Sequence, residues 1–315
     1  MRIGRAAWLT DTGRRRLRNE DAYVYEPPLF AIADGMGGAR AGEVAAEIAV
    51  TALKDARRDV TNEASLEAVI VDANRRIWER SVADPSTAGM GTTVTVAFVD
   101  APAERVVFGH VGDSRAYRLR GDELEQVTMD HSLVAELVQS GVLTPEEAER
   151  HPQRSAITRA VGTEHAINAD VFAVPAEVGD LFLICSDGLT DMLSEDEIAA
   201  SIEDAGRDPS AAAEALVAAA NARGGEDNIT VVLFELAEGE PEPTVSDPTN
   251  VTPVPIGVGS DTGPIPAAET LEDEAPEAAG VRHHGAGPGG RLAALAFIVG
   301  AIVVGALVLY WGISR

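Results

Sequence analysis

The amino-acid sequence predicts an α+β layered sandwich over residues 1–237 of a 315-residue chain. Short apolar strands follow one another in the middle of this region, where Gly121-Asp122 is typical of a hairpin turn. Amphipathic helices stand in groups before and after those strands. A doubly wound parallel sheet would instead alternate strands and helices strictly, so the clustering favours the layered α+β class.

The first part of this region is predicted to contain two strands and two helices. Apolar runs predict strands at residues 3–10 and 29–33. Helices are predicted at residues 39–57 and 66–78, because apolar residues recur there every three or four positions. The hairpin signal favours antiparallel pairing among the next four strands, which are predicted at residues 94–99, 105–111, 116–120 and 124–127.

The second part mixes short helices with strands. A helix is predicted at residues 133–140, which Gly141 ends, and another begins at Thr144, whose Thr-Pro-Glu-Glu sequence is typical of a capping box. The remaining elements are strands at residues 169–174 and 181–185, helices at 195–202 and 210–222, and a strand at 229–236.

The composition changes after residue 237. Residues 238–290 are rich in Pro, Gly, Thr, Ala and Glu, lack aromatic residues, and carry ten acidic groups against one arginine. Such a segment cannot bury enough apolar surface to fold, so we predict a disordered acidic linker. The domain organisation is therefore predicted as a folded domain at 1–237, a linker at 238–290 and a final helix at 291–315.

The final segment has the length and composition of a transmembrane helix. Residues 292–313 form a run of about 22 residues without a charge, which as a helix is long enough to span a bilayer. Arg282, two histidines and Arg291 precede this run, whereas only Arg315 follows it. This asymmetry favours a single-pass protein of the cell membrane with its folded domain in the cytoplasm.

The charge and the cysteine content exclude some partners. A net charge of −26 argues against nucleic acid, whose phosphates would be repelled, and favours divalent cations. Because the residues after 237 carry ten acids and three arginines, −19 of this charge belongs to residues 1–237. The single cysteine, Cys185, excludes an internal disulfide and is typical of a reducing compartment. No basic and apolar leader opens the chain, so no signal peptide is expected.

Four aspartates stand at the ends of predicted strands. Asp34, Asp113 and Asp187 each follow an apolar strand and adjoin a glycine, and Asp227 precedes the last strand. A carboxylate at the end of a buried strand is costly unless it is paired or coordinates a metal. Four such residues from distant parts of the sequence indicate one multi-metal site on a β-sheet scaffold. Hard divalent cations prefer such oxygen ligands.

A second unusual stretch precedes the first of these aspartates. Four arginines, at positions 14, 15, 16 and 18, lead directly into Asn19, Glu20 and Asp21. One interpretation is a solvated charge cluster. The other is a guanidinium group that binds a phosphate bidentately beside a metal site. The residues alone leave both interpretations open.

Taken in order, these motifs resemble those of the metal-dependent serine/threonine protein phosphatases, the type 2C family, in its bacterial form. The resemblance spans nearly all of residues 1–237. It implies a four-layer α-β-β-α sandwich of two antiparallel sheets flanked by helices, with the site in a cleft at one end. The matching motifs are Arg16-Leu17-Arg18-Asn19-Glu20-Asp21, Asp34-Gly35-Met36-Gly37-Gly38, Gly91-Thr92-Thr93, Gly112-Asp113-Ser114-Arg115, Ser186-Asp187-Gly188 and Gly225-Glu226-Asp227-Asn228.

The resemblance also implies a metal centre. Asp34 would bridge two Mn²⁺ or Mg²⁺ ions, and the Gly35 carbonyl would bind one of them. Asp187 and Asp227 would complete the other ion, and Asp113 would join Asp187 at a third, looser position. A hydroxide shared by the two ions would attack phosphorus in line, so no phospho-enzyme is expected.

Other residues would act around these ions. The resemblance implies that Arg16 binds the substrate phosphate and that Glu20 and Asp21 hold metal-bound waters. Met36 stands where eukaryotic members carry a histidine that is proposed as general acid, so the source of the leaving-group proton stays open. Residues 131–162 correspond to a flap beside the cleft that helps to select substrates.

The predicted function is hydrolysis of phosphoserine and phosphothreonine on proteins, in opposition to a serine/threonine protein kinase that would itself be a substrate. One alternative is a catalytically inactive adaptor of the same fold that binds phosphoproteins. Another is a small-molecule phosphatase or an anti-anti-sigma-type regulator. A cysteine phosphatase would need an arginine six positions after Cys185, where this chain has Asp191. The adaptor would not need the complete set of Arg16, Asp34, Asp187 and Asp227.

Overall fold

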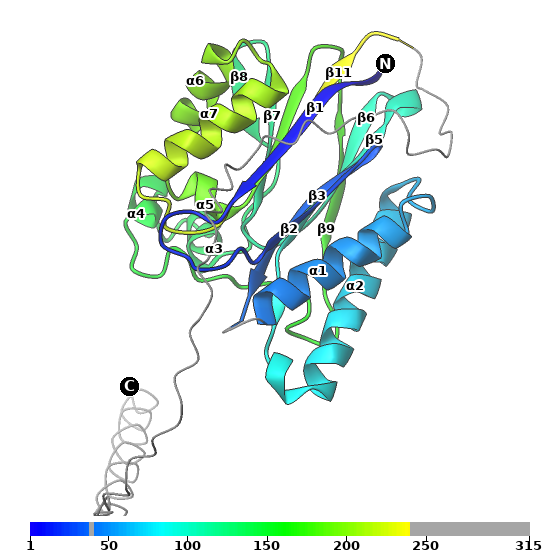
Figure 1. Ribbon diagram of the computed structural model, residues 1–315, viewed down its shortest axis with the longest axis vertical. Helices are drawn as coiled ribbons and strands as arrows, with labels where there is room; N and C mark the ends of the chain where they lie inside the picture. Colours follow the sequence, from blue (N-terminus) through cyan, green and yellow to red (C-terminus); the bar gives the residue numbers. More distant parts are fainter. Residues whose placement is uncertain (38–40, 240–315) are drawn as a thin grey trace, which may run out of the picture. The chain divides into compact units, whose positions relative to one another are not determined.

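The computed structural model describes residues 1–37 and 41–239, in which two antiparallel sheets pack face to face (Figure 1). The first sheet has the order β1 (Arg2–Asp11), β11 (Ile229–Ala237), β10 (Leu181–Cys185), β7 (Arg115–Arg120) and β8 (Glu123–Gln126). The second has the order β2 (Asp21–Glu26), β3 (Leu29–Met36), β5 (Val94–Asp100), β6 (Arg105–Val111) and β9 (Asp170–Pro175), and β4 (Gly91–Thr92) pairs with the end of β3.

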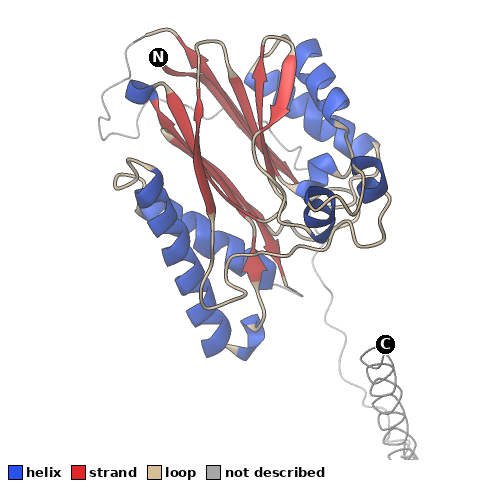
Figure 2. Ribbon diagram, turned by 180° about the vertical axis from the view of Figure 1, so that it is seen from behind, coloured by secondary structure: helices blue, strands red, loops and turns tan. Residues whose placement is uncertain are grey.

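Helices cover the outer face of each sheet (Figure 2). On the second sheet lie α1 (Ala41–Asp55) and α2 (Glu63–Ala83), and on the first lie α6 (Glu195–Asp204) and α7 (Pro209–Ala222). The shorter elements are α3 (Leu133–Gln139), α4 (Pro145–Glu149), α5 (Asp187–Thr190) and 3₁₀ turns at Pro85–Thr87 and Ala101–Ala103. The predicted sandwich of two antiparallel sheets flanked by helices is therefore confirmed.

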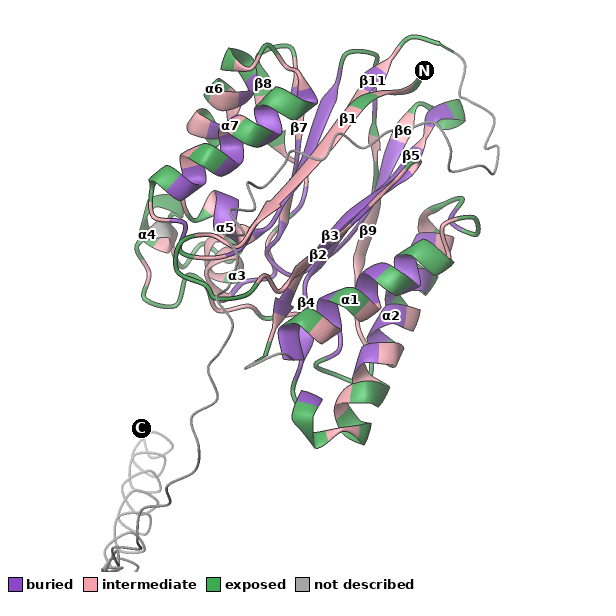
Figure 3. Ribbon diagram, viewed as in Figure 1, coloured by how far each residue is buried: buried purple, intermediate pink, exposed green. Residues whose placement is uncertain are grey.

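Aromatic side chains join the two sheets. Phe30 on β3 stacks on Phe234 of β11 with ring centroids 4.4 Å apart, and Phe182 on β10 stacks on the same ring at 5.2 Å. Apolar residues on the opposite faces of the strands pack beneath the helices. The strands are mostly buried or intermediate, whereas each long helix carries both buried and exposed residues (Figure 3). The packing of the two sheets therefore fixes the strand ends with respect to one another. It also fixes the positions of the aspartates at those strand ends.

The structure differs from the predicted elements in several places, which include the short elements β4 and α5 and the continuation of β3 to Met36 beyond the predicted end at residue 33. The second helix begins at Glu63 rather than 66, because Asn62 caps it by accepting a hydrogen bond from the Ser65 backbone N–H at 3.0 Å. Strand β2 was not predicted, although Ala22 and Val24 alternate with two tyrosines in the way a half-buried strand does. This strand matters for the site, because it begins at Asp21.

The predicted linker beyond residue 239 and the predicted transmembrane helix at 291–315 lie outside the described residues, as does Gly38 of the second motif. Among the helices at residues 1–37 and 41–239, none combines the length and the apolar character that crossing a bilayer requires.

Candidate metal centre

The strand-end aspartates gather where strands from both sheets end. In the first sheet Cys185 pairs with Val231 and with Arg115, so Asp187, Asp227 and Asp113 lie close to one edge. In the second sheet Asp21 pairs directly with Asp34 across β2 and β3. The two edges meet through a hydrogen-bonded contact, in which Asp21 Oδ2 accepts from two hydroxyl groups of the first sheet: Ser186 Oγ at 2.9 Å and Thr230 Oγ1 at 2.6 Å.

Close backbone approaches shape this edge. A Cβ atom at Gly35 would lie 2.2 Å from the Gly42 carbonyl oxygen and 2.6 Å from the Glu20 carbonyl oxygen, so a side chain there would displace the backbone that surrounds Asp34. A Cβ atom at Gly188 would lie 2.1 Å from the Asn228 carbonyl oxygen. The glycines beside Asp34 and Asp187 therefore allow neighbouring chain segments to approach these aspartates closely.

Burial and mutual repulsion raise the pKa values of the gathered carboxyl groups. Burial, opposed by hydrogen bonds from Thr230 and Ser186, raises the pKa of Asp21 to about 7. Burial and then the charge of Asp187 raise the pKa of Asp113 to about 7. Burial and then the charge of Asp227 raise the pKa of Asp187 to about 6.

Asp34 lies at the centre of this repulsion. Burial raises its pKa well above the ordinary range, and the carboxylates that add to the rise include all four of its acidic neighbours, Asp21, Asp187, Asp113 and Asp227. A set of acids that destabilise one another in this way is typical of a functional site rather than of a structural ion-pair network.

The residues present fit hard divalent cations. One carboxylate oxygen each of Asp21, Asp113 and Asp187 is buried without a hydrogen-bond partner. A divalent cation bound by oxygen ligands would satisfy these atoms and remove the repulsion. Within residues 1–37 and 41–239, however, no three acidic, histidine or cysteine side chains already surround one point as closely as a bound ion would require.

Arg16 brings a positive charge to the clustered aspartates. Its Nη2 atom donates to Asp227 Oδ2 at 2.5 Å, so the residue predicted to bind phosphate contacts a predicted metal ligand. Glu20 follows in the same segment, and its backbone N–H donates to Asn228 Oδ1 at 2.7 Å. The structure thus brings together Arg16, Glu20, Asp21, Asp34, Gly35, Asp113, Asp187 and Asp227.

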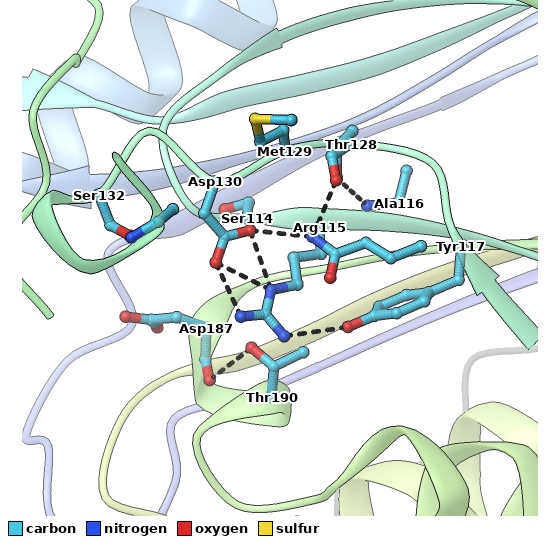
Figure 4. A network of polar contacts seen from close by, with 12 residues as sticks. Ser114, Arg115, Ala116, Tyr117, Thr128, Met129, Asp130, Ser132, Asp187 and Thr190 are labelled. Carbon is cyan, nitrogen blue, oxygen red and sulfur yellow. Dashed lines mark hydrogen bonds and ion pairs between the residues drawn. The ribbon is translucent and has the colours of Figure 1, made fainter. Parts of the chain in front are cut away.

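A second polar network, missed by sequence reasoning, supports the loop that carries Asp113 (Figure 4). The Arg115 guanidinium donates to Asp130 at 2.7 and 3.0 Å and to the Tyr117 hydroxyl at 3.3 Å. The next residue, His131, accepts at Nδ1 from the Gly112 backbone N–H at 3.1 Å. Asp130 and His131 therefore bind the chain on both sides of Asp113, at Arg115 and at Gly112. The sequence alone does not reveal these contacts.

Cys185 is unsuited to catalysis. It is buried on β10 in the core between the first sheet and the helices that cover it, and burial raises the pKa of its thiol to about 12. We expect Cys185→Ser to hydrolyse a phosphothreonine peptide within about twofold of the unchanged protein, because a thiolate is absent at neutral pH. Steady-state assays on folded protein check this, and an inactive but folded variant would restore the cysteine mechanism.

Comparison with known proteins identifies relatives of this chain. The family described as protein phosphatase 2C matches residues 13–219. The serine/threonine phosphatase stp of Listeria innocua is 41% identical over 242 residues, covering 73% of this chain and 95% of that protein. Protein phosphatase PhpP of Streptococcus pneumoniae is 42% identical over 246 residues, covering 74% and 98%.

Solved structures of serine/threonine phosphatases also superpose on this chain. The crystal structure of the Mycobacterium tuberculosis serine/threonine phosphatase PstP/Ppp superposes with a TM-score of 0.70 at 38% identity, covering 75% of this chain and all of that one. The catalytic domain of a phosphatase PstP, solved in complex with two manganese ions, superposes with a TM-score of 0.69 at 36% identity over 75% of this chain and 99% of that one. The chain belongs to the protein phosphatase 2C family.

Proposed function

We propose that this protein removes phosphate from phosphoserine and phosphothreonine residues of proteins in a reaction that depends on Mn²⁺ or Mg²⁺. One observation carries the proposal: acids from distant parts of the chain, Asp21, Asp34, Asp113 and Asp187, meet at one edge with raised pKa values beside Arg16. The family membership and the names of the relatives as serine/threonine phosphatases support the same activity.

Asp34, the Gly35 carbonyl, Asp187 and Asp227 would hold two ions, and Asp113 a third with Asp187. The two manganese ions in the PstP structure support this assignment. Bound Mn²⁺ or Mg²⁺ supplies Lewis acidity, which lowers the pKa of water and neutralises charge on the phosphate. The buried oxygens of Asp113 and Asp187 that lack hydrogen-bond partners are the donors that such an ion needs.

The remaining site residues orient these groups. Arg16 would exchange its bond to Asp227 for bidentate bonds to the substrate phosphoryl oxygens, where it neutralises charge as the ester bond breaks. Ser186 and Thr230 both donate to Oδ2 of Asp21, and its Oδ1 atom is buried without a hydrogen-bond partner. Asp21 and Glu20 would thereby hold water in place around the ligands.

The proposal is tested by phosphate release from phosphothreonine and phosphoserine peptides. The catalytically inactive adaptor predicts that these peptides bind without releasing phosphate. A full set of buried acids with raised pKa values does not favour the adaptor, because binding alone does not require that cost. The names of the relatives point to an active enzyme as well.

Replacement of Arg16 by glutamine is expected to lower kcat/KM for a phosphothreonine peptide by about a hundredfold, because a charge-assisted bidentate contact to the phosphoryl group is lost. The kcat/KM of Arg16→Lys should exceed that of the glutamine variant by less than about tenfold, since an ammonium group cannot bind two oxygens in one plane. Steady-state kinetics at saturating Mn²⁺ measure both variants. Equal kcat/KM for all three proteins would remove Arg16 from the phosphate site.

The organisation of the whole chain is also part of the proposal. Residues 1–237 would form the catalytic domain, residues 238–290 an acidic linker and residues 291–315 a membrane helix that leaves the domain in the cytoplasm. The uncharged run at 292–313 supports this organisation. Membrane fractionation with protease protection tests it, and full-length protein that stays in the soluble fraction would contradict it.

We further propose that a serine/threonine kinase is among the substrates. Kinases of this type carry phosphorylated loops, which are exposed phosphoserine and phosphothreonine segments of the kind this site would accept. A membrane anchor would place enzyme and kinase on the same surface. Co-purification followed by dephosphorylation of the kinase tests the pairing, and a kinase that stays fully phosphorylated would count against it.

A further inference from the structure

Residues 14–18, here called the arginine loop, connect β1 to β2 beside the metal centre. All five residues are exposed. The loop is nevertheless held in place, because two of its backbone N–H groups donate to the Gly225 carbonyl at 2.7 and 3.2 Å. Its last carbonyl accepts from Asn228 Nδ2 at 2.8 Å. Since Gly225 and Asn228 flank Asp227, the loop is fixed to the segment that carries this carboxylate.

The arginine loop presents positive charge that the protein itself does not neutralise. Most arginines in the described part of the chain pair with a carboxylate. Arg16 does so through Asp227. By contrast, Arg14, Arg15 and Arg18 form no ion pair within residues 1–37 and 41–239. These three arginines lie within five positions on one fixed loop, in a region whose net charge is −19.

We propose that Arg14, Arg15 and Arg18 recognise acidic side chains that flank the phosphorylated residue of protein substrates. The inference rests on the proposed function, because it places the substrate phosphate on Arg16 of the same loop. The three arginines lie within two positions of Arg16 in the chain, so a peptide whose phosphate reaches Arg16 passes beside them. Acidic flanking residues would supply the missing partners.

The charge of the surrounding domain favours a peptide over an extended anionic surface. Membranes and nucleic acids present negative charge over a wide area, which residues 1–237 with a net charge of −19 would repel. A short acidic segment instead meets mainly the loop, because exposed charges farther away than about 10 Å are screened at moderate salt. The loop would thus select among substrates rather than attach the domain to a surface.

The test compares two phosphothreonine peptides that differ only in their flanking residues, Asp and Glu in one and Gln and Ser in the other. For the full-length protein, kcat/KM is expected to be about tenfold higher for the acidic peptide at low salt, mainly through KM, since each exposed ion pair adds a small factor. This preference should shrink when NaCl is raised to about 0.5 M.

The variant R14Q/R15Q/R18Q is expected to lose the preference while it still hydrolyses the neutral peptide at the unchanged rate. Its matched control is R2Q/K54Q/R58Q, which removes the same charge at the far ends of β1 and α1 and should keep the preference. The apolar side chain of Leu17 is 99% exposed in the same loop, and Leu17→Ala should also keep it.

Each outcome decides between the proposals. Equal hydrolysis of the two peptides by the unchanged protein overturns the inference and leaves the proposed function intact. A preference that survives in R14Q/R15Q/R18Q also overturns the inference, and a simultaneous loss of binding to phosphatidylserine vesicles would then assign the loop to membranes. Absence of phosphate release from both peptides overturns the proposed function itself.

Discussion

Replacing Asp187 by asparagine is expected to lower kcat for a phosphothreonine peptide by about a thousandfold or more, because metal-ion catalysis supplies most of the rate in this chemistry. Asp187 begins α5, separated from the buried strand β10 only by Ser186, and one of its oxygens is buried without a hydrogen-bond partner. Asparagine keeps the shape of the side chain. Its neutral amide oxygen binds a hard cation more weakly than a carboxylate does.

The same variant should be more stable than the unchanged protein when metal is chelated. Burial and the charge of Asp227 raise the pKa of Asp187 to about 6, so the ionised carboxylate destabilises the folded protein at pH 7.5. Removing this charge should add about 1–3 kcal/mol to the free energy of unfolding. Both proteins are measured in EDTA. A higher Tm for the variant than for the unchanged protein, together with lost turnover, would show that the Asp187 carboxylate serves function rather than stability.

Asp196→Asn is the matched control for this variant. Asp196 lies in the first turn of α6, is exposed and belongs to the same predicted domain. Its replacement should leave both kcat and the Tm in EDTA nearly unchanged, since exposed charges contribute little. If Asp187→Asn retained full turnover, Asp187 would not be a metal ligand in this protein.

The strand-end aspartates could be predicted because each interrupts an apolar run. A carboxylate at the end of a buried strand costs free energy unless it is paired or binds a metal. Asp34, Asp187 and Asp227 could therefore be selected without knowledge of the fold. The structure brings them together because the strands beside them end at one edge, as the pairing of Cys185 with Val231 shows. Periodicity likewise predicted most helices and strands, since it reports which face of an element is buried.

Contacts between the two sheets could not be predicted from local pattern. Asp21 is held by Ser186 and Thr230, which lie more than 160 positions away on the other sheet. Periodicity does not say which strands of two sheets face each other. For the same reason the sequence left the role of the arginines at 14–18 open. The missed strand β2 is a different case, because its alternation of Ala22 and Val24 with two tyrosines is a local signal.

Adding Mn²⁺ to chelated protein is expected to restore hydrolysis from a negligible rate and to raise the Tm. At a concentration of about 100 times Kd, a ligand that binds the folded protein alone stabilises it by about 2.7 kcal/mol. The physical reason is the repulsion around Asp34, which a divalent cation would convert into attraction. Hydrolysis that survives exhaustive chelation would remove the metal mechanism altogether.

The stabilisation by Mn²⁺ should fade between pH 7 and pH 5. The pKa values of Asp21 and Asp113 are raised to about 7 and that of Asp187 to about 6, whereas unfolded aspartate titrates near 3.8. Between those values the folded, metal-free protein binds more protons than the unfolded chain, so its free energy of unfolding rises as the pH falls. Protons therefore compete with Mn²⁺ for the same oxygens at unusually high pH.

Buried histidines act in the opposite direction, and a difference measurement removes their contribution. Burial lowers the pKa of His110 to about 4 and that of His131 below its ordinary value, so both destabilise the fold on acidification. They do so with and without metal. The difference between the Tm in Mn²⁺ and the Tm in EDTA, measured from pH 8 to pH 5, therefore isolates the carboxylates. If this difference instead held constant down to about pH 4.5, these acids would titrate as ordinary aspartates and would not share one buried centre.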